Sequence, residues 1–468
     1  MELRFTSKVI AAGGVLLALL LLYVALSTAG SFRFCEVSDF LNYNMLGESI
    51  LVGQVHLKQG VHPGRAKAKD ASNPMLAFPY ISDAIIFEGK YYFLQEPLPR
   101  LIHAAFIMVT GKHLPTGAVV VGAAFGALLW VGLILQSVRK TLLPESPEWI
   151  FWFTWMSFAL SGTQLYMVSR PVVYHESIVA GMFFCLGGTV LFFHSLLKSQ
   201  YSNALLWLSG LCLGAAVLCR ITLILYPLSF ALCLLLRSGH VDGSAREIAK
   251  MASRLLFPVA CCVAVLLAYN YARFGDFLDF GRRYVAIPFP ILYAYCCIHD
   301  QFFRLAHIPI NLSIYLVSLP DFINRWPFMT HPIEWVTKGD VLIMKERVSS
   351  LLFMVPSLVL CFPFSRWFNA RPWGRPEKAI IAAALLPSLA TLLFFGLFVA
   401  TVGRYLYEFT PLLFVLVLLT VNAVWARVRV HPGQGRLFLA VLVILFIMNA
   451  FAGLVLGLDG LTQQLTVC

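Results

Sequence analysis

The sequence contains few charged residues: Asp, Glu, Lys and Arg together make up 12% of its 468 residues, about half the share of an average soluble protein. It has no P-loop and no Gly-x-Gly-x-x-Gly fingerprint, which argues against a domain that binds cytosolic nucleotides. It also lacks a basic stripe interleaved with aromatic residues. The net charge of +12 therefore does not indicate nucleic-acid binding. In a membrane protein, an excess of Lys and Arg is first a signal of which loops face the cytoplasm.

The eleven cysteines do not form a recognisable metal-binding or disulfide framework. Most lie inside apolar runs, where a thiol packs as a small hydrophobic group. Cys296 and Cys297 are adjacent, and neither they nor Cys35 and Cys468 have the spacing of zinc ligands. A disulfide between Cys35 and the adjacent pair stays open, because connectivity cannot be read from the sequence.

Apolar residues are abundant instead: 59% of the chain is hydrophobic, and many windows exceed the roughly 18 apolar residues that indicate a membrane-crossing helix. The basic start MELRFTSK and the apolar run after it resemble a signal peptide, but the length of the run favours an uncleaved anchor. The stretch 203–236 is too long for one helix in a bilayer, so we divide it at Arg220. Eleven spans are expected, at about 9–28, 115–137, 149–167, 176–195, 203–219, 221–236, 255–272, 348–364, 379–400, 409–426 and 437–457.

The predicted fold class is an all-α polytopic membrane protein, with a single transmembrane domain at about 1–457 and a short tail at 458–468. The basic residues orient it, because cytoplasmic loops carry an excess of Lys and Arg. With the N-terminus in the cytoplasm, every inside segment is basic, and two large loops face outside, at about 30–114 and 273–347. The inside segments contain Arg4, Lys8, Arg139, Lys140, Lys198, Arg237, Arg246, Lys250, Arg254, Arg366, Arg371, Arg375, Lys378, Arg427, Arg429 and Arg436.

The first large outer loop begins with a helical pattern that has Asp39 in its first turn. Apolar residues recur with helical spacing over 39–53, and Ser38 has the side chain of an N-cap. Asp39 either caps an interfacial helix through the helix dipole or serves as a general base for an acceptor hydroxyl. Further along the loop, Gly89 after Glu88 predicts a turn between two aromatic-rich extended pieces.

Several arginines fall on the predicted outer side, against the positive-inside trend. Arg220 and Arg404 lie in very short outer turns, and Arg273 opens the second large loop, close to Arg282 and Arg283. Such positions usually face the bundle interior or a water-filled cavity. A guanidinium makes two parallel hydrogen bonds to a phosphate, so one explanation is an anion site for a lipid phosphate.

Nearby carboxylates offer the simpler explanation for the same arginines. Asp276 and Asp279 are the closest acids in the sequence to the arginines of the second large loop. Glu408 lies four residues after Arg404, the spacing at which opposite charges pair on a helix. Such pairing would lower the value of Glu408 as a catalytic candidate.

Four patches of the sequence together resemble the glycosyltransferase-C superfamily, the polytopic enzymes that use polyprenyl- or dolichyl-phosphate sugars. The patches are SDFLNYNMLGESILVGQ, EGKYYFLQEPLPRLIHA, SRPVVYHESI with the later LCRITLIL, and YNYARFGDFLDFGRRY with GRYLYEFTPLL. The chain looks most like the group that includes protein mannosyltransferases and lipid A aminoarabinose transferases. The resemblance covers most of 1–430 through short motifs, and it implies a GT-C-like helical bundle with large outer loops.

The resemblance also implies roles for individual residues. Asp39 would be the catalytic base, and His175 with Glu176 would form a second polar cluster near the donor phosphate or a divalent metal. Both residues of that cluster are therefore the metal candidates, although the patch reads His-Glu rather than Asp-Glu, which leaves the metal cofactor open. The implied substrate- and phosphate-binding residues are His175, Glu176, Arg220, Arg273, Arg404, Tyr405, Lys90 and Tyr91.

The expected function is an inverting hexosyl- or pentosyltransferase that works at the outer face of a bacterial inner membrane. Its implied partners are a polyprenyl-phosphate sugar donor, a lipid, glycan or protein acceptor, and membrane lipids, without nucleic acid. A flippase of lipid-linked saccharide is one alternative, but transporters favour inverted repeats with polar residues near the bilayer midplane. A polysaccharide polymerase or ligase is another, and Asp39 with the two unequal outer loops favours the transferase.

Overall fold

The computed structural model describes residues 2–34, 43–197, 202–238, 245–324, 329–330, 333–362 and 375–465. Within them, six helices are long and apolar enough to cross a membrane. They are α1 (Glu2–Ser27), α5 (Thr116–Leu142), α8 (Val173–Leu197), α11 (Ala245–Phe274), α16 (Arg375–Leu397) and α18 (Pro432–Leu465).

Shorter elements complete the bundle. Its other apolar helices include α9 (Asn203–Cys219), α10 (Leu225–Ser238) and α17 (Leu413–Val428). The remaining helical elements are α2 (Tyr43–Leu51), α3 (Pro63–Ala66), α4 (Pro97–Thr110), α6 (Glu148–Ala159), α7 (Gly162–Val168), η1 (Ile221–Ile224), η2 (Arg282–Tyr284), α12 (Pro290–Tyr293), η3 (Ala294–Ile298), η4 (Leu305–His307), α13 (Ile308–Val317), α14 (Leu351–Met354), η5 (Pro356–Cys361) and η6 (Gly403–Glu408).

The predicted division at Arg220 is confirmed. This residue has an extended backbone, with φ −160° and ψ 111°, and it separates α9 from η1 and α10. Two consecutive helices therefore fill the stretch 203–236 and reverse direction through a tight turn. The turn leaves the Arg220 side chain at the end of the bundle rather than in its apolar middle.

The prediction of eleven continuous spans is not confirmed. The predicted span 149–167 is divided, because α6 ends at Ala159 and the hydroxyl of Ser161 caps α7 by accepting a hydrogen bond from Gln164 N. In the described part of the predicted span 348–364, the helical elements are α14 and η5. Pro356 comes directly after Val355, the C-cap of α14, and a proline has no N–H with which to continue an α-helical ladder.

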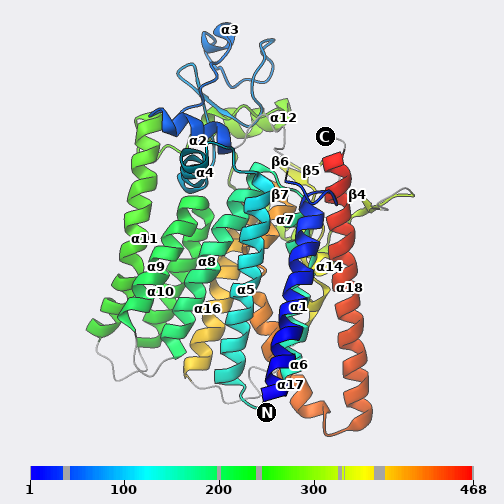
Figure 1. Ribbon diagram of the computed structural model, residues 1–468. Helices are drawn as coiled ribbons and strands as arrows, with labels where there is room; N and C mark the ends of the chain where they lie inside the picture. The colour runs from blue at the N-terminus through cyan, green and yellow to red at the C-terminus, as the bar shows by residue number, and fades with distance from the viewer. Residues whose placement is uncertain are drawn as a thin grey trace.

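Close backbone contacts hold the central helices together. α8 packs between α5 and α9, and α9 packs in turn against α11, as Figure 1 shows. A Cβ added to Gly210 of α9 would lie 2.2 Å from the carbonyl oxygen of Leu255 in α11. Small residues permit such approaches between apolar helices, so Gly210 sets the α9–α11 distance.

A set of loops, short helices and strands covers one end of the bundle, at the top in Figure 1. We call it the loop end; it comprises the described residues of 43–114 and 275–350. In it, β1 (Ile85–Phe87) pairs with β2 (Lys90–Tyr92) in an antiparallel hairpin. Glu88 and Gly89 have φ of 47° and 72°, the left-handed geometry of a type I′ turn, so the turn predicted at Gly89 is confirmed.

Strands also attach the loop end to the helices that follow it. β5 (Ile333–Lys338) pairs antiparallel with β6 (Val341–Glu346), and β6 pairs in parallel with β7 (Ala400–Val402) after α16. β3 (Asp321–Phe322) and β4 (Met329–Thr330) form a separate small ladder, and β4 contacts α18. A Cβ on Gly403 would lie 2.3 Å from the Arg347 carbonyl oxygen, so this glycine lets the chain after β7 pass directly beside the end of β6.

We predict that Gly210→Ala lowers the stability of the protein by about 1–3 kcal/mol, the usual cost of overpacking. The added methyl group meets backbone, which cannot move aside as a side chain can. The matched control is Gly122→Ala in α5, where the nearest 4 Å are empty and alanine favours the helix by up to about 1 kcal/mol. The midpoint of thermal unfolding in detergent should fall only for the first variant; an equal response of both would contradict the close contact.

Candidate functional site

A cavity of about 440 Å³ lies where the loop end meets the helices. Six charged side chains line it, three arginines and three carboxylates, together with two tyrosines and a wall rich in phenylalanine. Such a mixture suits a ligand that carries both polar groups and an apolar part. The charged and tyrosine lining residues are Asp83, Glu96, Glu346, Arg220, Arg282, Arg404, Tyr174 and Tyr405.

Arg220 is held by a carboxylate from a distant part of the chain. Its Nε donates to Glu408 Oε1 over 2.7 Å, and the Glu408 side chain is fully buried. The hydroxyl of Thr222 donates to the other carboxylate oxygen, and the hydroxyl of Tyr226 donates to the Glu408 backbone carbonyl over 2.6 Å. The turn between α9 and α10 is thereby fixed to η6.

Arg404 has a different partner from the predicted one. Its guanidinium donates to Glu346 over 2.8 and 3.5 Å, and it stacks on the ring of Tyr174, 4.8 Å from its centroid. The predicted pairing with Glu408 is wrong, because residues 403–408 form a 3₁₀ helix and Glu408 faces Arg220 instead. In a 3₁₀ helix, residues four apart do not share a face as they do in an α-helix.

Tyr405 lies between two of the arginines. Its ring centroid is 5.0 Å from the guanidinium carbon of Arg220 and 5.4 Å from that of Arg404. The π face of an aromatic ring attracts a cation at these distances. Arg220, Arg404 and Tyr405 were all predicted site residues, and the structure brings the three together in one cavity wall.

Arg282 is the third arginine of the cavity. It stacks over Phe303, with its guanidinium carbon 4.7 Å from the ring centroid. Burial lowers its pKa; the charge of Arg220 adds to the lowering, while Glu96 opposes it. A bound anion would relieve this repulsion between two cations, so Arg282 and Arg220 form an electrostatically favourable place for a phosphate.

Glu96 brings a carboxylate to the same region. Its Oε1 accepts a hydrogen bond from the backbone N–H of Ile221 over 2.9 Å, which ties the start of α4 to the turn at Arg220. Burial raises the pKa of this carboxyl group, and the charge of Arg220 opposes the rise. Glu96 is thus both a structural link and a polar group in the cavity wall.

A second cavity of about 430 Å³ adjoins the first. The two share several lining residues, among them Arg282 and the phenylalanines 302 and 303. Its own wall adds Asp279, Arg283 and Asp300, with the apolar residues Ile224, Leu225 and Leu278. The shared wall makes the two cavities neighbouring compartments, with Arg282 between them.

Behind the cavity, Asn44, His103 and Glu176 form a buried polar chain. Asn44 accepts a hydrogen bond from Leu114 N and donates one to Leu114 O, which fixes its amide orientation. His103 Nδ1 must therefore donate to Asn44 Oδ1, over 2.8 Å. His103 Nε2 contacts Glu176 Oε1 over 2.6 Å, and both side chains are fully buried.

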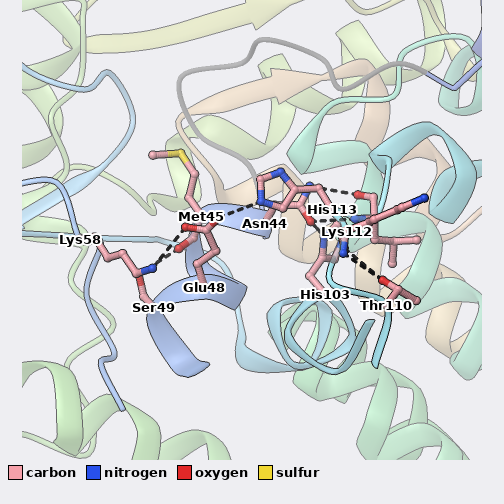
Figure 2. A network of polar contacts seen from close by, with 10 residues as sticks. Asn44, Met45, Glu48, Ser49, Lys58, His103, Thr110, Lys112 and His113 are labelled. Carbon is pink, nitrogen blue, oxygen red and sulfur yellow. Dashed lines mark hydrogen bonds and ion pairs between the residues drawn. The ribbon is translucent and has the colours of Figure 1, made fainter. Parts of the chain in front are cut away.

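Figure 2 shows the Asn44–His103 end of this chain together with the neighbouring contacts of Glu48, Lys58 and His113. Glu48, one turn along α2 from Asn44, contacts His113 Nε2 over 2.8 Å and Lys58 Nζ over 3.4 Å. The hydrogen bond from His113 lowers the pKa of the Glu48 carboxyl group. The contacts of α2 therefore join it to α4 and to the segment after α4.

The other predicted site residues contact groups outside the described cavity wall. His175 Nδ1 donates to the Met167 carbonyl over 3.1 Å, and Arg273 donates to Phe93 O and Asn270 Oδ1 over 2.7 and 2.6 Å. Tyr91 is buried in the core of the loop end, whereas Lys90 is exposed. Asp39, the predicted base, lies outside the described residues.

The two metal candidates do not form a metal centre with their described neighbours. His175 packs against the ring of Tyr166, while Glu176 contacts His103. In the described parts of the chain, no three His, Cys, Asp or Glu side chains are close enough together to hold a metal ion. Cys296 and Cys297 are free thiols, and Cys35 lies outside the described residues.

Sequence reasoning did not select three carboxylates of the cavity, Asp83, Glu96 and Glu346, and it gave Arg282 no individual role. Asp83 lies shortly before strand β1, and Glu346 is the last residue of strand β6. Only the pairing of each strand with its own partners brings the two carboxylates to one cavity. Glu96 stands directly before Pro97, the first residue of α4. An acid before a helix-starting proline was the one available signal, since that position is a helix N-cap.

The chain matches no protein-family model and no curated protein sequence. Its structure is similar to the apo oligosaccharyltransferase of Archaeoglobus fulgidus, with a TM-score of 0.53 and 13% identity, covering 96% of this chain and 55% of that one. A structure of the same enzyme with an inhibitory peptide and a dolichol-phosphate gives a TM-score of 0.50 and 12% identity over the same shares. ArnT from Cupriavidus metallidurans, bound to undecaprenyl phosphate, has a TM-score of 0.48 and 12% identity, with 98% and 78% covered.

The similarity to the archaeal oligosaccharyltransferase establishes the fold. The chain has the helical membrane fold of that archaeal enzyme. It spans about half the length of that archaeal enzyme. The predicted fold class is therefore confirmed, apart from the number of spans.

We predict that Glu408→Gln destabilises the protein by about 3 kcal/mol, because it leaves a largely buried arginine without its counter-charge. The matched control is Glu247→Gln, which removes the partner of Lys250 in a half-exposed pair; such pairs contribute about 0–1 kcal/mol. Thermal unfolding in detergent measures both. A double variant, Arg220→Gln with Glu408→Gln, should recover part of the loss, and equal effects of Glu408→Gln and Glu247→Gln would contradict the burial argument.

Proposed function

We propose that the protein is a membrane glycosyltransferase that moves a sugar from a polyprenyl-phosphate donor to an acceptor. One observation carries the proposal: a cavity with three arginines, three carboxylates and an aromatic wall lies at the loop end of a glycosyltransferase-C fold. The similar structures include an archaeal oligosaccharyltransferase in complex with a dolichol-phosphate. That similarity supports the same class of ligand for this chain.

The donor phosphate binds between Arg282 and Arg220 in this proposal. Arg220 already has a carboxylate partner, so Arg282 supplies the charge that a phosphate neutralises. Tyr405, in contact with Arg220, adds a hydroxyl group at the same wall. Preorganised cations of this kind stabilise the negative charge that develops on a leaving phosphate.

The apolar wall suits the first isoprene units of the carrier. Phe280, Phe302, Phe303 and Phe394 line both compartments, next to the guanidinium of Arg282. A phosphate at Arg282 would therefore have phenylalanine rings beside it, where an isoprenoid chain can be buried. Each buried CH₂ contributes about 0.8 kcal/mol, so a short part of the chain adds substantially to donor affinity.

The chemical step is a displacement at the anomeric carbon of the sugar. Asp39 acts as general base and takes the proton of an acceptor hydroxyl while the hydroxyl oxygen bonds to the anomeric carbon. The bond from that carbon to the phosphate oxygen breaks, and the polyprenyl phosphate leaves with the electron pair. Attack from the side opposite the leaving group inverts the anomeric configuration; the resemblance of SDFLNYNMLGESILVGQ supports this role for Asp39.

The remaining predicted residues act from behind the cavity wall. His175, Glu176 and Arg273 are buried and bonded to protein groups, so they hold α8, α4 and α11 in position. Lys90 and Tyr91 belong to the hairpin, whose core residues support the loop end. In this proposal the substrate contacts come from Arg220 and Arg282 of the cavity wall rather than from His175 and Glu176 of the SRPVVYHESI patch.

The proposed location is a bacterial inner membrane, with the N-terminus in the cytoplasm and the cavity facing outside. The distribution of Lys and Arg supports this orientation. A donor from the outer leaflet would reach the cavity from the bilayer, and the acceptor would be a lipid, a glycan or a protein at the same surface. The whole chain from 1 to 457 forms the proposed catalytic domain.

The test uses purified protein with a panel of polyprenyl-phosphate monosaccharides and lipid, glycan and peptide acceptors. We expect the wild type to transfer one sugar, Asp39→Asn to lose at least about 100-fold in kcat, the lower range for general-base catalysis, and Arg282→Gln to lose about 10- to 100-fold in kcat/KM. The assay separates product by mass spectrometry. Arg436→Gln, an exposed arginine of α18, is the matched control and should keep wild-type turnover.

Three results would contradict the proposal or one of its parts. Absence of transfer with every donor and acceptor, in protein that moves lipid-linked saccharide across a proteoliposome membrane, would favour a flippase. Full turnover by Asp39→Asn would remove the base assignment while leaving the enzyme class intact. Full turnover by Arg282→Gln would place the phosphate elsewhere in the cavity.

A further inference from the structure

Asp83 has an unusual backbone for a residue with a side chain. Its φ is 61°, in the left-handed region that few non-glycine residues adopt. The surrounding hydrogen bonds enforce this conformation: Asp83 N donates to Ala286 O over 3.0 Å, and Ala286 N donates to Ala84 O over 2.8 Å. A strained residue that its neighbours hold in place is commonly one whose side chain has a task.

The held backbone delivers the Asp83 carboxylate to the larger cavity, where Tyr174, Glu346 and Arg404 are also wall residues. Burial raises the pKa of the Asp83 carboxyl group, and the charge of Glu346 raises it further, while Tyr174 and Arg404 oppose the rise. The carboxylate therefore gains from any further hydrogen-bond donor that enters the cavity.

Charge divides the cavity into two parts. In one part, Asp83 and Glu346 outnumber the single cation Arg404, which Glu346 already engages at 2.8 Å. In the other part, Glu408 pairs with Arg220, and Glu96 offsets part of the repulsion between Arg220 and Arg282, whose guanidinium stacks on Phe303. A phosphate is attracted to the second part and repelled by the first, whereas hydroxyl and ammonium groups prefer the first.

We infer that Asp83 is a specificity-determining residue of the donor site, which accepts a hydrogen bond from a hydroxyl or ammonium group of the transferred sugar. The inference rests on the proposed function and deepens it. A phosphate at Arg282 and Arg220 leaves the sugar to extend toward the carboxylates of the same cavity. Glu346 assists indirectly, because it pairs with Arg404 and neutralises that cation. The Asp83 carboxylate therefore stays available to the sugar.

The experiment measures affinity as well as turnover. Wild type, Asp83→Asn and Asp83→Gly are titrated in detergent with undecaprenyl phosphate and with its glucosyl, arabinosyl and glucosaminyl derivatives. Asparagine and glycine both adopt left-handed backbone, so neither variant adds strain at this position. Asp321→Asn, an exposed acid of β3, is the matched control, and unfolding midpoints verify that each variant is folded.

We expect Asp83→Gly to weaken binding of the preferred glycosyl derivative about 10-fold or more, since a hydrogen bond to a charged group contributes about 1.5–3 kcal/mol and 1.4 kcal/mol is tenfold. Binding of bare undecaprenyl phosphate should stay within twofold. The Asp83→Asn variant distinguishes a hydroxyl donor of the sugar from an ammonium donor. It keeps an acceptor oxygen but not the negative charge, so a hydroxyl contact loses less affinity than an ammonium contact.

An unchanged ratio of glycosyl to bare affinity in both variants would overturn the inference. So would an equal loss for both ligands, because that result assigns Asp83 to phosphate binding or to structure. If the wild type transfers no sugar, the proposed activity fails. The affinity ratio still decides the role of Asp83 in that case, so the two failures are distinguishable.

Discussion

The rest of the structure depends on guanidinium groups that are buried where the helices meet the loop end. A cation taken out of water requires a nearby opposite charge, and breaking a buried pair costs several kcal/mol. Arg220 meets this requirement through Glu408, and Arg404 through Glu346. Each pair joins segments that are far apart in the sequence, so the positions of α9, η6 and β6 depend on these contacts. Arg282 differs, because stacking on Phe303 leaves its charge available to a ligand.

Backbone geometry makes these contacts reachable. Gly403 lets the chain after β7 run beside the end of β6, which sets Arg404 against Glu346. The extended backbone of Arg220 turns the chain between two helices and exposes its side chain to the cavity. Asp83 reaches the same space from a left-handed position. Three local backbone features, in three unrelated segments, therefore produce one polar cavity at the end of an otherwise apolar set of helices.

The sequence predicted the helical class, the turn at Arg220 and the turn at Gly89, because each depends on local composition or on chain length in a bilayer. It also selected Arg220 and Arg404, since an arginine on the outer side of a membrane protein stands against a strong compositional trend. The pairing of Arg404 was mispredicted, because helical spacing was assumed where a 3₁₀ helix forms. Asp83 and Glu346 were not selected, because strand pairing between distant segments determines their place and no local pattern records it.

The pair of Arg220 and Glu408 has a consequence for biosynthesis. The two residues are 188 positions apart, and translation adds about 5–20 residues per second. Arg220 therefore leaves the ribosome roughly 10–40 seconds before its counter-charge exists. During that interval the hairpin of α9 and α10 must keep the arginine at the membrane–water boundary, in contact with water or lipid headgroups. The ion pair with Glu408 can form only after η6 has been synthesised, so the cavity is completed late in synthesis of the chain.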